Sequence, residues 1–139
     1  MPFPADVVIR AVDANDGEHE CRIATAVEGR ECQIAASVDG GDPLTGSAGD
    51  FFEALRVVRR ALDENGLRLC CGGARRDAWA SGMQRDMALG RSCYVVSMPR
   101  TKQLAAVVGV LDPAPLDTIG TVADQDQFHR EWLASSTDD

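Results

Sequence analysis

The stretch CRIATAVEGRECQIAASV, residues 21–38, decides the fold because it holds two strands and the turn that joins them. Apolar and polar residues alternate on both sides of Gly29-Arg30, which is the pattern of a half-buried strand. A two-residue turn with glycine first would pair Glu28 with Glu31. The pairs that follow are Val27 with Cys32, Thr25 with Ile34, Ile23 with Ala36, and Cys21 with Val38. Both apolar sets then lie on one face, so we predict an antiparallel hairpin.

A third strand is predicted ahead of this hairpin, in DVVIRAVD at residues 6–13. A tight turn at Asp16-Gly17 would bury Arg10, whereas a shift of one residue exchanges the two faces of the strand. The shifted register needs a longer loop and buries Val7, Ile9 and Ala11. We predict the shifted register, because it leaves the guanidinium group in water.

Residues 50–66, DFFEALRVVRRALDENG, predict a helix with signals at both ends. Asp50 is the expected N-cap, and Glu53 stands at the spacing of a capping box. Asn65-Gly66 is typical of a helix end, because glycine adopts the left-handed conformation easily. The apolar stripe consists of Phe51, Leu55, Val58 and Leu62, and the residues expected largely off it are Arg56, Arg59, Arg60 and Asp63.

The second half of the chain predicts three further strands and a closing helix. Residues 39–49 are expected to form a loop, because glycine and proline are frequent there. A helix capped by Thr121 should dock through Phe128 and Trp132. The expected ranges are 67–72, 92–98 and 104–111 for the strands and 121–135 for the helix.

These elements together predict an α+β fold in one domain, residues 1–139, with a frayed tail at 135–139. Its antiparallel sheet is expected to combine the N-terminal three-strand meander with the further strands. The central helix and the C-terminal helix are expected to pack on that sheet.

The composition is that of an acidic globular protein. The chain has 139 residues, 26% of them charged, and a net charge of −8, so general nucleic-acid binding is not expected. No apolar run approaches the ~20 residues of a membrane span, and the start MPFPADVVIR lacks the pattern of a signal peptide. We therefore predict a cytoplasmic protein that binds neither membranes nor nucleic acids.

The five cysteines do not predict a metal site. They form no CxxC pair, and the neighbours Cys70 and Cys71 would point to opposite faces of a strand. The two histidines, His19 and His129, are far apart in sequence. In a cytoplasmic chain we expect reduced thiols that are buried as small hydrophobic groups. We expect neither a metal nor another cofactor.

The basic residues gather in one part of the chain. Residues 68–102 hold seven of the fourteen Lys and Arg residues and only two acidic ones, a local net charge of +5 against −13 elsewhere. Within this part, GGARRDAWASGMQRDMALGRS, residues 72–92, combines glycines and arginines with a tryptophan and two methionines. This stretch is the predicted site.

A short helix is predicted from Ser81 or Gly82 to Gly90, with Met83 and Met87 facing the core and Arg85 and Asp86 facing outward. A helix start beside glycines and arginines suits an anion. The candidate ligand- or partner-binding residues are Arg75, Arg76, Asp77, Trp79, Ser81, Met83 and Arg85. In the alternative interpretation the arginines are solvated or paired with nearby carboxylates, the methionines fill the core, and Trp79 covers a sheet edge.

The spacing of residues 73–90 resembles the central signature of a family of small, uncharacterised bacterial proteins, roughly G-A-R-x-D-x-x-x-S-G-M-x-R-x-M-x-x-G. The similar tail pattern comprises Leu111-Asp112-Pro113, Gly120-Thr121-Val122, Gln125, Phe128 and Trp132-Leu133. Members often carry proline where this chain has Ala80. The resemblance spans about residues 50–135 and implies no activity. It implies one shared local structure for Arg75, Asp77, Ser81, Met83 and Arg85.

Two functions follow as hypotheses. The first is a non-catalytic protein-binding domain of the toxin-neutralising (immunity) or regulatory kind, because an acidic surface suits a basic protein partner. Trp79 and Trp132 would anchor that partner if they are exposed. The second is a small-molecule-binding protein or enzyme, in which arginines of residues 72–92 hold a carboxylate or phosphate. We favour the first and propose no catalytic residue, because neither histidine is expected near a nucleophile.

Overall fold

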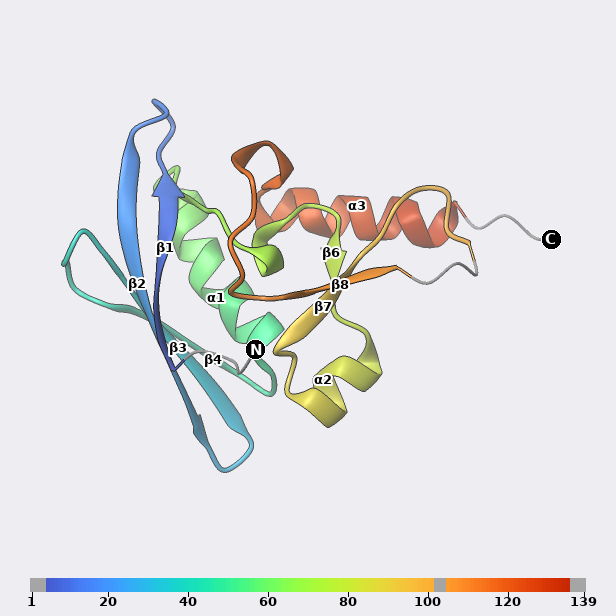
Figure 1. The fold of residues 1–139 in the computed structure, drawn as a ribbon, viewed down its shortest axis with the longest axis horizontal. Helices are drawn as coiled ribbons and strands as arrows, with labels where there is room; N and C mark the ends of the chain where they lie inside the picture. Colours follow the sequence, from blue (N-terminus) through green and yellow to red (C-terminus); the bar gives the residue numbers. More distant parts are fainter. Residues whose placement is uncertain (1–4, 102–104, 136–139) are drawn as a thin grey trace.

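The computed structural model describes residues 5–101 and 105–135 and has the predicted mixed α+β architecture. Five antiparallel strands form the main sheet in the order β4-β3-β2-β1-β5. Their bounds are Asp6–Val12 for β1, Glu18–Glu28 for β2, Glu31–Val38 for β3, Leu44–Ala48 for β4 and Arg68–Leu69 for β5. The helix α1, Phe51–Glu64, packs on one face of this sheet (Figure 1).

A second, smaller sheet lies on the other side of α1 from the main sheet (Figure 1). It has the order β6-β7-β8. Of the later strands predicted to extend the first sheet, β5 does so, whereas β7 and β8 lie in this second sheet. The bounds are Ala78–Trp79 for β6, Ser92–Val95 for β7 and Ala106–Gly109 for β8. The helix α2, Gly82–Ala88, connects β6 to β7, and α3, Val122–Ala134, ends the described chain beside α1.

The predicted hairpin register is confirmed. Glu28 pairs with Glu31 and Cys21 with Val38, and Gly29 takes the positive φ of 61° that the tight turn needs. The shifted register of β1 is confirmed as well, since Ile9 and Ala11 are buried and Arg10 is exposed. Five residues, 13–17, form the longer loop between β1 and β2.

The strand β4 was wrongly predicted as loop, because its sequence LTGSA has no apolar alternation. The structure shows why small residues are needed there. A Cβ atom added to Gly46 would lie 2.6 Å from the Ala54 carbonyl oxygen and 2.9 Å from a methyl group of Val58. The missing side chain therefore lets α1 pack directly on the edge strand, a contact that no local pattern predicts.

The helix α1 follows the predicted signals in most respects. Asp50 accepts a hydrogen bond from the Glu53 backbone nitrogen at 2.8 Å, and Gly66 has a φ of 70° beyond the helix end. The Glu53 side chain pairs with arginines instead of completing the capping box. The placement of Arg56 and Arg59 off the buried surface was wrong, since both are buried. The helix is enclosed on two sides, so its second face is interior too.

The five cysteines are free and buried, as predicted. Burial raises the pKa of Cys21 to about 11 and the pKa of Cys71 and Cys93 to about 12. Among the helices of the described residues, none is long and apolar enough to cross a membrane. The predicted frayed tail lies outside the described residues except for Ser135.

His19, at the start of β2, joins two loops at one end of the main sheet. Its Nδ1 lies 2.5 Å from Asp39 Oδ2 and its Nε2 lies 2.7 Å from Asp13 Oδ2. Both ring nitrogens therefore face carboxylates, an arrangement that suits the doubly protonated imidazolium. The hydrogen bonds to Asp13 and then Asp39 raise the pKa of His19 above 6.5, and they lower the pKa of both carboxyl groups.

Replacing His19→Gln should therefore reduce stability in a pH-dependent way. A raised folded-state pKa stabilises the fold below 6.5, the value of the unfolded chain, and this contribution is lost as pH rises through the folded pKa. The urea midpoint of the variant should fall below that of the wild type at about pH 5.5, and the difference should shrink towards pH 9. A difference that grows with pH would contradict this sign.

Candidate functional site

The glycines that open residues 72–92 are packed by the chain itself. A Cβ atom at Gly72 would lie 2.3 Å from the Gly109 carbonyl oxygen, and one at Gly73 would lie 3.0 Å from the Val110 Cβ atom. The backbone nitrogen of Gly72 donates to Asp112 at 2.7 Å, and that of Gly73 donates to Val110 at 2.9 Å. The close approach to these glycines is thus made by the last residue of β8 and the turn that follows this strand.

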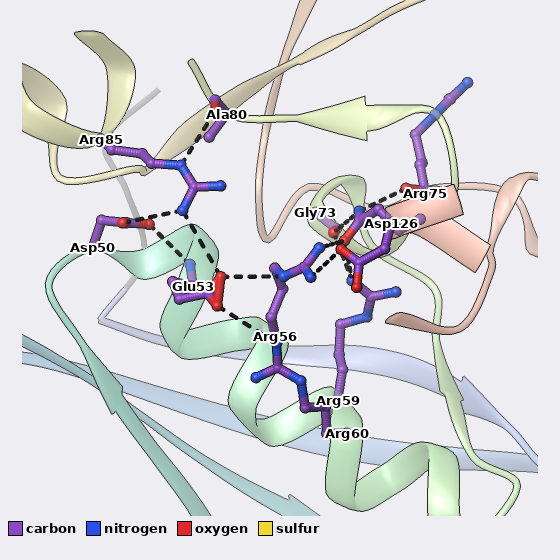
Figure 2. Close-up of polar contacts among 11 residues, drawn as sticks. Asp50, Glu53, Arg56, Arg59, Arg60, Gly73, Arg75, Ala80, Arg85 and Asp126 are labelled. Atoms are coloured by element: carbon purple, nitrogen blue, oxygen red, sulfur yellow. Dashed lines mark hydrogen bonds and ion pairs between the residues drawn. The ribbon is translucent and has the colours of Figure 1, made fainter. Parts of the chain in front are cut away.

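A buried polar network lies behind this segment, built by Arg56 and Arg59 of α1, which are labelled in Figure 2, and by Gln125 of α3. Arg59 is 2% exposed and Gln125 is 0% exposed. Both guanidinium groups donate to the Gln125 side-chain oxygen, Arg56 at 2.8 Å and Arg59 at 2.9 Å. The Gln125 amide nitrogen donates in turn to the carbonyl oxygens of Gly73 at 2.9 Å and Arg75 at 2.8 Å.

Arg59 also donates to the carbonyl oxygens of Gly73 at 3.1 Å and Gly120 at 2.8 Å. Its hydrogen-bond partners in the described chain are therefore neutral oxygens, and burial lowers the pKa of its guanidinium group. Arg56 pairs with Asp126 and, through Nε at 3.1 Å, with Glu53. The network thus ties α1 and α3 to the backbone of residues 73–75.

Arg75 and Arg76 point to different partners. Arg75 forms a two-point pair with Asp77, Nε to Oδ1 at 2.9 Å and Nη2 to Oδ2 at 3.1 Å. This pair raises the pKa of the Arg75 guanidinium. Arg76 is exposed and donates to the Asp117 carbonyl oxygen at 2.8 Å.

Arg85 faces inward, although it was predicted to face outward. Its Nε donates to the Ala80 carbonyl oxygen at 3.2 Å, and its Nη1 lies 3.5 Å from Asp50 and 3.8 Å from Glu53. The guanidinium carbon lies 4.9 Å from the centre of the Phe52 ring. In Figure 2, Arg75 and Arg85 stand on opposite sides of the view. The structure therefore does not bring these two predicted anion-binding groups together.

Trp79 is half-buried in an aromatic cluster. Its ring stacks on His129, with the ring centres 3.8 Å apart and an angle of 9° between the planes, and meets the edge of Phe52 at 5.6 Å. Trp132, also half-buried, stacks on the same imidazole at 5.7 Å. Burial, followed by the charges of nearby arginines, lowers the pKa of His129. Neither tryptophan is the exposed anchor that the first hypothesis considered.

The helix α2 has the predicted cap but the opposite orientation. Ser81 accepts from the Gln84 backbone nitrogen at 3.1 Å and donates its own backbone N–H to the Gln84 side chain at 2.8 Å. The prediction that Met83 and Met87 face the core is wrong, since they are 72% and 81% exposed. Because Arg85 is held by acidic and aromatic groups of α1, the methionines turn to solvent.

The end of α2 is fixed against α1. Leu89 takes a left-handed φ of 56°, its carbonyl oxygen accepts from the Phe51 backbone nitrogen at 2.7 Å, and Gly90 follows with a φ of 64°. A Cβ atom at Gly90 would lie 2.6 Å from the Asp50 carboxylate. The two methionines are thus presented on a helix whose two ends are both held.

The sequence did not predict the network: Arg56 and Arg59 were expected off the apolar stripe, and Gln125 appeared only in the tail pattern of the resemblance. Phe52, Arg56 and Arg59 do follow one another at helical spacing, so a second interior face of α1 leaves a weak signal. Arginine at those positions is equally typical of a solvated face.

No family model matches the chain, and no curated protein matches it. The resemblance of about residues 50–135 to a bacterial family therefore stays a prediction.

Replacing Gln125→Ala should lower the free energy of unfolding by about 3 kcal/mol, because two buried guanidinium groups and two carbonyl oxygens lose a partner. Gln127→Ala is the matched control, since Gln127 is exposed on the same helix, and we expect its cost to stay within ~0.5 kcal/mol. Chemical denaturation measures both. Equal effects of the two variants would contradict a structural role for the network.

Proposed function

We propose that the protein is a non-catalytic, cytoplasmic protein-binding domain that neutralises or regulates a basic protein partner. The observation that carries this proposal is the exposure of Met83 and Met87, four residues apart on α2. Two large apolar side chains on one helix face suit insertion into a groove of another protein.

The chemistry of these side chains favours recognition. Methionine is unbranched and polarisable, so it adapts to irregular apolar surfaces and is frequent at binding surfaces. The backbone beneath is rigid, because Ser81 caps one end of α2 and Leu89 and Gly90 fix the other. Binding of a partner would therefore cost the conformational entropy of two side chains but not that of the backbone.

The charge of the molecule favours a basic partner. The net charge is −8, because residues 68–102 carry +5 and the rest of the chain carries −13. Opposite charge accelerates association and excludes partners of the same sign. This combination suits a toxin-neutralising or regulatory protein.

An arginine-lined site for a carboxylate or phosphate has less support. Arg75 and Arg85 already face carboxylates of the same chain, so an anion would have to displace them. Burial keeps the pKa of Cys71 and Cys93 high, which disfavours the reactive thiolate. The Ser81 hydroxyl oxygen is engaged in the helix cap.

Replacing Met83→Gln together with Met87→Gln should weaken binding of the partner at least about tenfold, because the apolar contact is lost while the side-chain length is kept. The tagged protein would first recover its partner from lysate of the source organism, identified by mass spectrometry. Titration of the purified pair then gives the Kd.

The matched control is Met98→Gln, because Met98 is also exposed, at 41%, but lies outside α2. The control should bind as the wild type does, and all variants should unfold at the same temperature. The proposal fails if no protein is enriched by the wild type. It also fails if the double variant binds as tightly as the control.

A further inference from the structure

The main sheet has a second face that no helix of the described chain covers (Figure 1). On β2 it presents the even-numbered residues 18–28, and on β3 the odd-numbered residues 31–37, since the opposite set is directed towards α1. We call this surface the outer sheet face.

The centre of the outer sheet face is flat. Ala24 lies opposite Ala35, and Ala26 lies opposite Gln33, so alanine occupies three of the four central positions of β2 and β3. Thr45 and Ser47 of β4 continue these rows. These six residues border a shallow hollow of about 320 Å³. Gln33 is the one long side chain among these six residues, so another protein surface can come close to the sheet beside it.

The turn end of this face carries two carboxylates that the fold does not neutralise. Glu28 and Glu31 are directly opposite in the register and both are exposed. Like charges in this relation destabilise a sheet. Within residues 5–101 and 105–135 neither forms an ion pair, and Arg30 in the turn between them pairs with neither. A cation supplied from outside would remove this repulsion.

The other end of the face is acidic as well. Glu20 is exposed and its side chain has no ion-pair partner in the described residues. It borders a hollow of about 410 Å³ with Arg22 and Ser37. Arg22 itself pairs with Asp6 at 3.1 Å, and Arg10 pairs with Glu18 at 2.9 Å. The arginines of the face are thus compensated, while Glu20, Glu28 and Glu31 are not.

We infer that the outer sheet face docks a basic protein surface. Arg or Lys side chains of the partner would reach Glu28 and Glu31 at the turn end and Glu20 at the other end, and the alanine centre would lie against the partner between them. Charge complementarity selects this occupant, because the carboxylates at both ends of the flat centre are unpaired. The inference rests on the proposed function and adds a second contact surface to α2.

The test removes two charges without changing shape. Glu28→Gln with Glu31→Gln is compared with Glu64→Gln and Glu131→Gln, which have the same net charge but lie on α1 and α3, where both residues are exposed. The probe is an eight-arginine peptide titrated into each protein and followed by backbone amide NMR. We expect the largest wild-type shifts around Ala24, Ala26, Gln33 and Ala35.

The Glu28→Gln, Glu31→Gln protein should bind the peptide roughly fivefold or more weakly than its control, and it should unfold at a higher temperature, because the repulsion is gone. Loss of binding together with gain of stability excludes misfolding as the cause. Equal weakening in both variants, or shifts centred on another surface, would overturn the inference.

The recovered partner separates this inference from the proposed function. If its Kd depends on Met83 and Met87 but is the same for the two glutamate variants, the outer sheet face is not its docking surface and the proposed function stands. If no partner is recovered, the proposed function fails, and the peptide titration still decides whether this face is selective for basic groups.

Discussion

The hydrogen bonds that Arg56 and Arg59 share through Gln125 are the constraint on which the arrangement of this protein depends (Figure 2). A buried guanidinium group needs hydrogen-bond acceptors around it, because an unpaired charge in the interior is strongly destabilising. Arg59 finds its acceptors in the backbone of Gly73, Gly120 and the Gln125 side chain. Satisfying this one side chain therefore fixes two distant parts of the chain against α1, Gly73 and the segment 120–125.

That constraint determines what residues 72–92 present to solvent. The backbone at Arg75 accepts a hydrogen bond from Gln125 of the network. Further along, the Arg85 side chain contacts Asp50 and Phe52 at the start of α1. The arginine that resembled a ligand-binding group is thus a structural contact. Because Arg85 lies on the inner face of α2, Met83 and Met87 lie on its outer face and are exposed to solvent. The exposure of two apolar side chains on α2 is thus a consequence of the polar contacts in the interior.

The sequence predicted the elements better than their contacts. The register of β2 and β3 followed from Gly29 and two-residue alternation, and the cap of α1 from Asp50, because these signals are local. The strand β4 was missed because glycine is needed at position 46 only for the close contact with α1, which the local sequence does not reveal. The orientation of α2 was wrong for a similar reason: spacing alone gives an apolar and a polar face, and it was the contacts with Asp50, Glu53 and Phe52 that decided which face is buried.

The most direct measurement of the central claim is amide hydrogen exchange in an Arg59→Met variant, with Arg60→Met as control because Arg60 is exposed on the same helix. If the network holds residues 72–92 in place, exchange at Gly73, Arg76 and Gly120 will accelerate, while the β2–β3 hairpin keeps its protection. Unchanged exchange at those three amides, or acceleration spread evenly over the molecule, would contradict it.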